Sequence, residues 1–543
     1  MVSVINHRDD YISQGYWRNE NIYSYLQDAV NCFPNKVAIV DPYDRLTYQD
    51  LNDQVKKLAG GLLSIGVKKG DVVSFQMPNW IECAVIHQAI SMIGGVSNPI
   101  IPIYRNKEVK YILKQSNTKV LIVPATFRQF NYLEMARSIL YDGEVGTVEK
   151  ILVVDKYSNH PVLNPEIELD FSQFIKNSYS NDDVASINET DPALLLYTSG
   201  TTANPKGVLH SHNTLLHENR TIIELYNLTE EDTVFMPSPV THITGLLYGL
   251  ELSFMIQGKV VYQDIWSPAD AIQLMIKEQC SWTVGATPFL RGIVESLTNE
   301  DKKHLKLKAF PCGGADVPPE LIKQASDVLG CYVTRVYGSS EYPTLTACNA
   351  RDPLHKAAFT DGRLIEGSKA KVVDDNGENL PCGTVGELAV KGPEMFLGYT
   401  QKEFNNDAFL TDGYFLTGDL ACIDEDGYIE IIGRKKDIII WNGENISVKE
   451  VEELLYQHEK IKQVAIVAMP DPKTGEKACV FVVPKPENSI TLEEISQFLI
   501  EKQIAKQKLP ERLEIIDEMP MTASGKIQKF MLKERIINKL KGI

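Results

Sequence analysis

Closely spaced cysteine pairs are absent from this sequence, and so is any excess of positive charge. The nine cysteines are an odd number and include no C-x-x-C pair, which argues against a disulfide framework or a zinc site and for reduced thiols. The formal net charge of −17 disfavours non-specific binding to nucleic acid or to an anionic membrane. An anionic ligand must therefore meet a local positive site.

Long uninterrupted apolar runs are also missing. The most apolar stretch, residues 83–103, contains His87, Gln88 and Pro99, which favours a buried helix followed by a strand over a membrane span. The first residues, MVSVINHRDD, lack the basic and apolar parts of a secretory leader, and the final Lys541-Gly542-Ile543 is no peroxisomal address. We therefore expect a cytoplasmic protein.

Core-forming residues are plentiful. The 543-residue chain is 43% hydrophobic and 23% charged, which supports two to four soluble domains. Over residues 1–190, helical and strand patterns alternate. Thr47 and Asp50 predict a capped helix start, residues 72–75 read as a buried strand, and residues 80–92 read as the next helix. Repeated units of this kind predict an α/β fold built on doubly wound, largely parallel sheets.

The pattern changes after residue 367. Short strands separated by Asp/Asn/Gly turns over residues 367–433 predict antiparallel pairing and a small β-barrel. A basic cluster at 434–436 then precedes a new α+β unit. Two Ser/Thr-x-x-Glu patterns in that unit predict helix caps, namely Ser447 with Glu450 and Thr491 with Glu494. We expect a large N-terminal domain over residues 1–433 and a smaller C-terminal domain over residues 437–543.

Residues 196–208, reading LYTSGTTANPKGV, concentrate groups that bind phosphate. Backbone N–H groups of a tight loop can point at one anion, hydroxyls add uncharged donors, and Lys206 adds a positive charge. A predicted strand at 193–197 places the loop at a strand end, where α/β sheets bind ligands. Pro205 precedes the lysine and Gly207 follows it, so the loop is no Walker A motif. The predicted phosphate-binding residues are Thr198, Ser199, Gly200, Thr201, Thr202 and Lys206.

This loop resembles the signature loop of the acyl-adenylate-forming superfamily, which contains acyl-CoA synthetases, the adenylation domains of peptide synthetases and firefly-type luciferases. Further segments resemble family elements and follow in the family's order along the chain. The resemblance implies a reaction in two steps. A carboxylate attacks the α-phosphate of ATP, which gives acyl-AMP and pyrophosphate, and the thiol of coenzyme A then displaces AMP.

The same resemblance assigns the nucleotide site. In Tyr337-Gly338-Ser339-Ser340-Glu341, the carboxylate of Glu341 would hold Mg²⁺ and Ser340, where the family more often has threonine, would donate to the α-phosphate. On residue chemistry alone, a carboxylate beside hydroxyls at a strand end suits Mg²⁺ but is also common in ordinary loops. The resemblance makes Gly313, Gly314 and Ala315 the adenine-binding loop, and Asp419 and Arg434 the ribose-binding pair.

The catalytic assignments also rest on the resemblance. His242 would line the acyl tunnel, and Lys526 would neutralise the carboxylate and triphosphate as they meet. With Lys206 and Glu341 these are the predicted catalytic residues. The C-terminal domain would be mobile and rotate about a hinge at Lys436. Rotation would replace Lys526 by a thioester-forming loop that contains Gly443, Glu444 and Asn445.

One position departs from the pattern. Acyl-CoA synthetases of this type usually carry an arginine where this chain has Trp441, and this difference affects how coenzyme A is held.

Three alternatives to an acyl-CoA ligase are an enzyme that loads an acid onto a carrier protein, a luciferase-like oxygenase and a non-catalytic nucleotide-binding protein. The segment 240–245 contains no Asp for a substrate ammonium, which favours a plain acid.

The segments expected to line the acid pocket are neutral and partly apolar, which suits a medium-chain, alicyclic or aromatic acid. They are residues 242–246, 287–289, 313–315 and 338–339. The sequence leaves the oligomeric state, a homodimer included, open.

Overall fold

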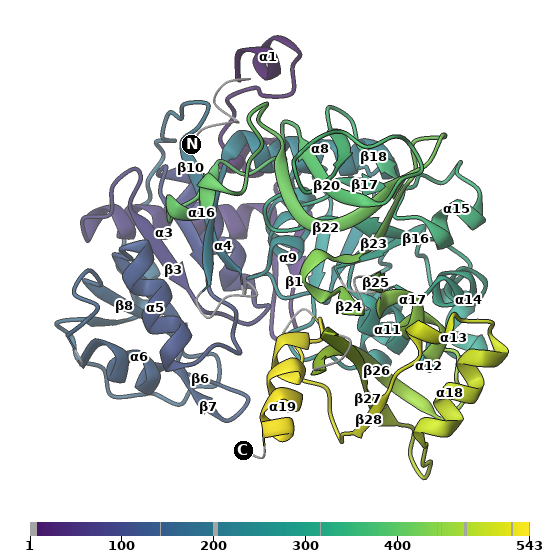
Figure 1. Ribbon diagram of the computed structural model, residues 1–543. Helices are drawn as coiled ribbons and strands as arrows, with labels where there is room; N and C mark the ends of the chain where they lie inside the picture. The colour runs from purple at the N-terminus through teal and green to yellow at the C-terminus, as the bar shows by residue number, and fades with distance from the viewer. Residues whose placement is uncertain are drawn as a thin grey trace.

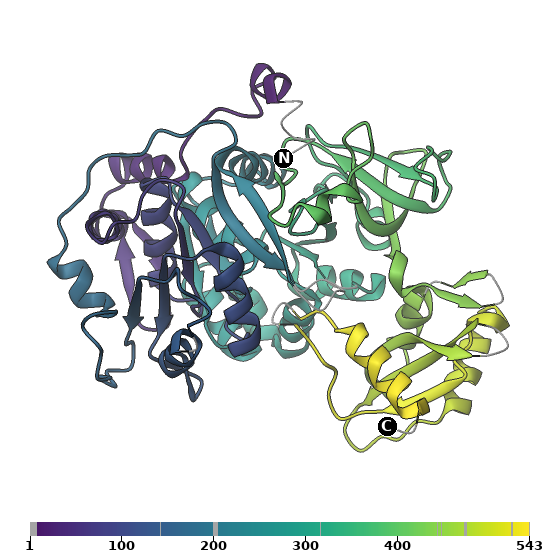
Figure 2. The ribbon, with the colours of Figure 1, turned by 60° about the vertical axis from the view of Figure 1, so that its left-hand side comes forward.

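The protein consists of a large lobe and a smaller C-terminal lobe, joined by a narrow connection (Figures 1 and 2). The computed structural model describes residues 8–141, 143–198, 205–314, 317–441, 444–446, 448–471, 475–522 and 525–541. Strand β23 (Ile429–Arg434) is the last strand of the large lobe, and β24 (Ile439–Trp441) is the first strand of the small lobe. The short 3₁₀ turn η3 (Lys435–Asp437) connects them.

The first sheet of the large lobe is parallel in its centre and antiparallel at one edge. Its strand order is β21 (Gly398–Tyr399), β11 (Lys206–Ser211), β10 (Pro192–Thr198), β4 (Val96–Pro99), β3 (Val72–Phe75), β5 (Val120–Pro124), β8 (Lys150–Val154) and β9 (Glu168–Asp170). Strands β10, β4, β3, β5, β8 and β9 pair in parallel. β11 pairs antiparallel with both of its neighbours, β10 and β21.

The second sheet places the ends of two central strands side by side. Its order is β18 (Arg363–Leu364), β17 (Thr346–Ala347), β16 (Tyr332–Tyr337), β15 (Ala309–Gly313), β14 (Trp282–Thr283), β12 (Thr233–Met236), β13 (Lys259–Tyr262), β1 (Val37–Val40) and β2 (Arg45–Thr47). β15 and β16 run parallel with Gly313 opposite Val336. The two strands therefore end at the same edge of the sheet.

Local sequence signals explain several of the helices. Thr47 and Asp50 form the predicted capping box at the start of α3 (Tyr48–Ser64). In α4 (Ile81–Met92) every residue except Glu82 is buried, because this helix packs against α2 (Ile22–Cys32), α3 and η2 (Leu247–Glu251). The parallel sheets and their helices confirm the predicted α/β fold.

The remaining helices and short strands of the large lobe complete its layers (Figure 1). They are α1 (Arg8–Ser13), α5 (Asn106–Ser116), β6 (Thr126–Phe127), β7 (Phe130–Asn131), α6 (Tyr132–Tyr141), α7 (Phe171–Asn177), α8 (His212–Tyr226), α9 (Ile243–Leu246), α10 (Leu252–Met255), α11 (Pro268–Lys277), α12 (Thr287–Ser296), α13 (Asn299–His304), α14 (Pro319–Leu329), α15 (Leu354–Phe359) and α16 (Glu403–Asn406).

The predicted β-barrel over residues 367–433 is an open sheet. Its four antiparallel strands lie in the order β19 (Lys369–Val373), β20 (Gly386–Lys391), β22 (Phe415–Ile423) and β23. Within the described part of the chain, β19 and β23 remain edge strands of this sheet and no closed barrel forms. The turn pattern predicted the antiparallel strands correctly, but closure depends on pairing between the first and last strands, which alternation of residues does not encode.

The small lobe has the predicted α+β composition. Its sheet contains β24, β25 (Glu444–Ile446), β26 (Ile461–Asp471), β27 (Gly475–Pro484) and β28 (Arg512–Ile515). Its helices are α17 (Val448–Leu455), α18 (Leu492–Glu501), the 3₁₀ turn η4 (Lys506–Lys508) and α19 (Lys529–Lys541).

Alternate residues of β26 pack into two hydrophobic clusters, Val464 and Ile466 into one and Ala465 and Val467 into the other. Thr491 and Glu494 form the predicted capping box of α18, while Ser447 lies outside the described residues. None of the helices in the described ranges is long and apolar enough to cross a bilayer.

Candidate active site

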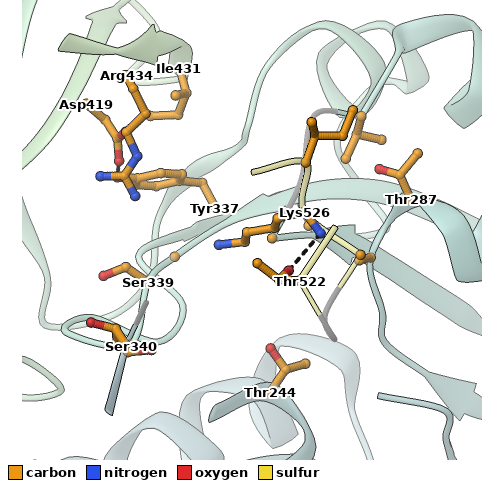
Figure 3. A pocket seen from close by; sticks show the side chains of 18 of the residues that line it. Thr244, Thr287, Tyr337, Ser339, Ser340, Asp419, Ile431, Arg434, Thr522 and Lys526 are labelled. Carbon is orange, nitrogen blue, oxygen red and sulfur yellow. Dashed lines mark hydrogen bonds and ion pairs between the residues drawn. The ribbon is translucent and has the colours of Figure 1, made fainter. Parts of the chain in front are cut away.

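A cavity of about 1150 Å³ lies between the two lobes. Figure 3 shows side chains from both lobes that point into it, with Tyr337, Asp419 and Arg434 from the large lobe and Lys526 from the small lobe. The structure brings most of the predicted site residues together here. They are Thr198, Lys206, His242, Gly313, Gly314, Tyr337, Gly338, Ser339, Ser340, Glu341, Asp419, Arg434, Lys436 and Lys526.

The predicted phosphate loop is held by the β10–β11 hairpin. Thr198 and Lys206 are direct partners across this antiparallel pair, so both lie at the mouth of the hairpin. The Lys206 ammonium lies 4.8 Å from the ring centroid of Tyr399 and 4.7 Å from that of Phe404, which favours a cation at this position. Ser199, Gly200, Thr201 and Thr202 lie outside the described residues.

The loop that carries Glu341 has a tight turn at its start. A Cβ atom on Gly338 would lie 1.7 Å from the Pro343 carbonyl oxygen, so only glycine fits. Ser339 Oγ accepts hydrogen bonds from the backbone N–H groups of Glu341 and Tyr342, each at 3.2 Å. These contacts fix the direction in which the backbone of Glu341 leaves the turn.

Two residues outside the motif support the same loop from β11 and β21. His210 Nε2 donates to the Ser340 carbonyl oxygen at 2.7 Å, and burial lowers the pKa of His210 to about 4, so the ring is neutral. The Tyr399 hydroxyl donates to Glu341 Oε1 at 2.7 Å. His210 follows Lys206 and Val208 at the period of two expected on one strand face, so the sequence held a signal for it. It held none for Tyr399.

Glu341 offers one carboxylate to a cation. In the described ranges no group of three or more His, Cys, Asp or Glu residues could hold a metal by itself. A single carboxylate fits Mg²⁺ when the substrate phosphates and water supply the other oxygen ligands. The residues present are therefore compatible with a shared Mg²⁺ and do not form a closed protein site.

Asp419 and Arg434 are neighbours across β22 and β23. Arg434 Nε lies 2.9 Å from Asp419 Oδ1, and the Tyr337 hydroxyl donates to Asp419 Oδ2 at 2.5 Å. Burial raises the pKa of Asp419 despite the opposing effect of Arg434. Figure 3 shows the side chains of Asp419, Arg434 and Tyr337 grouped together. This arrangement presents an ordered carboxylate edge that suits the vicinal hydroxyls of a ribose.

The predicted adenine loop begins at the end of β15. A Cβ atom on Gly313 would lie 2.3 Å from the Val336 carbonyl oxygen, and Gly314 has a φ of +80°. Both positions therefore require glycine. The backbone of this segment is open to a flat ring from the cavity side. Ala315 lies outside the described residues.

The turn that carries Lys526 packs against the large lobe. Lys526 N–H donates to Thr522 Oγ1 at 3.0 Å. A Cβ atom on Gly525 would lie 2.9 Å from Pro288 Cγ, so the turn touches the start of α12. The Lys526 Cε atom lies close to Gly314. Lys526 is therefore held over the predicted nucleotide site by contacts of its own turn.

His242 lines the cavity at the start of α9. Burial and the nearby Lys526 ammonium lower the pKa of His242 to about 3, so its imidazole is neutral at physiological pH. A neutral ring can donate one hydrogen bond and accept another, but it adds no positive charge.

The predicted thioester-forming loop is only partly described. The backbones of Glu444 and Asn445 pair with those of Trp441 and Ile440 in the β24–β25 hairpin, and Gly443 lies outside the described residues. The lining residues that the structure describes include none of this loop but do include Lys436 of η3. The roles of Lys436 and of this loop stay predictions.

Comparison with known proteins agrees with this geometry. The family described as AMP-binding enzyme matches residues 26–400, and the one described as AMP-binding enzyme C-terminal domain matches residues 450–526. The chain is 36% identical to a medium-chain fatty-acid–CoA ligase of Escherichia coli over 98% of this chain and 93% of that protein.

Two solved structures of one relative, with and without nucleotide, are similar to this chain. ATP-bound MatB from Rhodopseudomonas palustris matches with a TM-score of 0.85 at 26% identity, over 95% of this chain and 99% of that one. The apo form of MatB, over the same shares, matches with a TM-score of 0.74. This chain therefore superposes more closely on the nucleotide-bound form than on the apo form. Two matched family regions and a relative similar over nearly its whole length establish that this chain belongs to the AMP-binding enzyme family and is an AMP-forming acid–thiol ligase.

Proposed function

We propose that the protein is an ATP-dependent acyl-CoA ligase that activates a carboxylic acid as acyl-AMP and then transfers the acyl group to coenzyme A. One observation carries the proposal: the Lys526 side chain of the small lobe enters the same cavity as Lys206, Glu341 and the Asp419–Arg434 pair of the large lobe. A carboxylate and a triphosphate repel each other, so a cation placed between them lowers the barrier to their reaction.

Each group has a task in the first step. Asp419 and Arg434 orient the ribose, and the hairpin residues Thr198 and Lys206 bind the phosphates. Glu341 would hold Mg²⁺, which neutralises phosphate charge when bound. Lys526 stabilises the negative charge that gathers as the acid approaches the α-phosphate. In the second step the lobe at residues 437–543 rotates about Lys436 and removes Lys526 from the cleft.

The acid is expected to be a neutral, medium-sized one. Near His242 in the chain and in the neighbouring strand ends, the cavity lining includes the uncharged residues Ile243, Leu247, Tyr248 and Val284. These side chains suit the hydrocarbon part of an acid. The similarity to a medium-chain fatty-acid–CoA ligase supports acids of about that size. The same similarity supports coenzyme A as the thiol substrate.

A pyrophosphate-release assay tests the proposal. The protein is given ATP, Mg²⁺ and a panel of straight-chain, alicyclic and aromatic acids, with and without coenzyme A. We expect acid-dependent pyrophosphate release and, with coenzyme A, an acyl-CoA product. Lys526→Ala should abolish acid-dependent release and keep ATP binding, because its ammonium acts on the reacting groups. ATP binding without release for any acid would contradict the proposal.

Trp441 is the residue most relevant to the binding of coenzyme A, because an arginine is usual at this position. Its backbone lies in β24 at the start of the hairpin that leads to the proposed thioester loop. If an arginine here helps to hold an anionic part of coenzyme A, Trp441→Arg should lower the KM for coenzyme A and leave the KM for ATP unchanged. An unchanged KM for coenzyme A would show that Trp441 does not limit its binding.

A further inference from the structure

A charged side chain of the small lobe is buried against the large lobe in the wall of the cavity between the lobes. Lys449 lies in the first turn of α17 and is 9% exposed. Its ammonium donates a hydrogen bond to the carbonyl oxygen of Ile431, which belongs to β23 of the large lobe. This hydrogen bond therefore spans the boundary between the lobes.

The surroundings of Ile431 supply the opposite charge. The Ile431 N–H donates to Asp361 Oδ2 at 2.9 Å, and Asp361 is paired with Arg335 at 2.9 Å. Burial alone would raise the pKa of Asp361, but Arg335 and Lys449 hold it below its ordinary value. The Asp361 carboxylate is thus ionised and attracts a cation that arrives from the small lobe.

Helix geometry makes this placement unusual. A cation in the first turn of a helix meets the positive end of the helix dipole, and burying an ammonium costs part of its hydration. Within α17 alone, Lys449 would therefore be better placed in solvent. Its buried position is compensated only while the Ile431 carbonyl and the Asp361 carboxylate are within reach, that is, in the present arrangement of the lobes.

The contact bears on the active site through β23. That strand carries Ile431, Arg434 and the start of the connection to the small lobe. Other contacts at this interface include the packing of Gly525 on Pro288 and the approach of the Arg291 guanidinium to the Tyr456 ring at 5.6 Å. Lys449 adds a directional, charged contact to these.

We propose that Lys449 is a positioning residue that stabilises the lobe arrangement in which Lys526 enters the cleft. The inference rests on the proposed function, in which this arrangement serves acyl-AMP formation and a different one serves thiol transfer. The described hydrogen bond of Lys449 goes to a backbone carbonyl of the large lobe, so we assign its effect to the position of Lys526. Its removal should slow the first half-reaction and spare the second.

The test compares Lys449→Met, which keeps the length of the stem without the charge, with the conservative Lys449→Arg. Lys460→Met is the matched control, because Lys460 pairs with Glu494 inside the small lobe. Acid-dependent pyrophosphate release measures the first half-reaction, and thiol transfer from supplied acyl-AMP measures the second. The rate of tryptic cleavage after Lys435 and Lys436 reports on the connection between the lobes without requiring activity.

We expect Lys449→Met to slow acyl-AMP formation about ten-fold, the effect of losing one charged hydrogen bond, with thiol transfer within about two-fold and faster cleavage of the connection. Lys449→Arg should restore all three. Equal slowing of both half-reactions, or no change in cleavage, would overturn the inference. Should the unmodified protein activate no acid, the proposed function fails, while an unchanged cleavage rate in Lys449→Met would separately reject the positioning role.

Discussion

The Tyr399 hydroxyl donates to the Glu341 carboxylate at 2.7 Å, while the ring of the same tyrosine faces the Lys206 ammonium. Burial and the adjacent carboxylate raise the pKa of Tyr399 well above its ordinary value, so the phenol keeps its proton throughout the physiological range. One side chain thus orients the proposed Mg²⁺ ligand and packs against the proposed phosphate-binding lysine.

Tyr399→Phe should separate these two effects. Phenylalanine keeps a ring beside Lys206 but removes the donor to Glu341, and a hydrogen bond to a charged group contributes about 1.5–3 kcal/mol. We expect the Mg²⁺ concentration needed for half-maximal pyrophosphate release to rise about ten-fold or more, with a smaller change in the KM for ATP. Glu341→Gln is the reference for complete loss of the ligand. An unchanged Mg²⁺ dependence in Tyr399→Phe would mean that the phenol does not orient the carboxylate.

Asp419→Asn tests the proposed ribose site. The substitution keeps the size of the side chain and removes the charge that pairs with Arg434 at 2.9 Å. Charge-assisted hydrogen bonds are roughly twice as strong as neutral ones, so ATP affinity measured by calorimetry should fall by about ten-fold or more. Binding of inorganic pyrophosphate, which lacks a ribose, should change little. An equal loss of affinity for ATP and for pyrophosphate would indicate that Asp419 acts on the phosphates and not on the ribose.

Gly338→Ala should damage the loop that carries Glu341. The added methyl group would lie 1.7 Å from the Pro343 carbonyl oxygen, and relief requires a shift of the backbone. Overpacking of this kind costs about 1–3 kcal/mol, visible as a lower melting temperature together with lost activity. Gly146→Ala is the matched control, since nothing lies within 4 Å of its added Cβ. A Gly338→Ala protein that melts and reacts like the control would contradict the tight turn at the start of this loop.

We expect a pair of buried carboxyl groups, Glu218 and Glu394, to contribute to the pH dependence of stability. Glu218 accepts from the Tyr248 hydroxyl, and Glu394 accepts from Thr221 Oγ1 at 3.3 Å. Burial raises the pKa of both acids, and the proximity of Glu218 raises that of Glu394 further. The folded protein therefore retains a proton that the unfolded chain releases above a pKa of about 4.5.

The sign of this linkage predicts the effect of Glu394→Gln. A raised folded pKa contributes stability that is complete below the unfolded pKa and is lost as pH rises toward the folded pKa, at about 1.4 kcal/mol per pH unit for one proton. Glu394→Gln removes one titrating group. Its free energy of unfolding, measured by urea titration between about pH 5 and 8, should fall less steeply with pH than that of the unmodified protein. Parallel pH profiles for the two proteins would show that Glu394 does not retain a proton in the folded protein.

Local signals predicted the elements they encode. The capping boxes at Thr47 and Thr491 are complete within four residues, so the helices begin where the sequence indicates. The prediction of a closed barrel over residues 367–433 was wrong because closure depends on contacts between distant parts of the chain. Whether β19 meets β23 depends on the twist of the whole sheet and on what covers its edges, and neither is written in the alternation of one strand.

The residues of the candidate active site also fall into two groups, those that local motifs predict and those that depend on contacts between distant segments. Those predicted from motifs lie at strand ends, where sheet topology brings them together, and this holds for Gly313, Tyr337 and Lys206. Tyr399 became apparent only in the structure, where it pairs with Val208, a residue far apart in the chain. The period of two along β11 indicated His210, but its hydrogen bond to Ser340 depends on tertiary packing. Lys449 depends on how the two lobes meet, which no local pattern specifies.

The register of β10 and β11 has a consequence for insertions and deletions. Thr198 stands opposite Lys206, and side chains alternate between the two faces of a strand. An insertion or deletion in the connection between them that is transmitted to the ladder would slide the ladder by one step. A one-step slide turns the Lys206 ammonium to the opposite face. Natural variants and engineered loop grafts that shift this register should therefore lose the cation from the site even where Lys206 itself is unchanged.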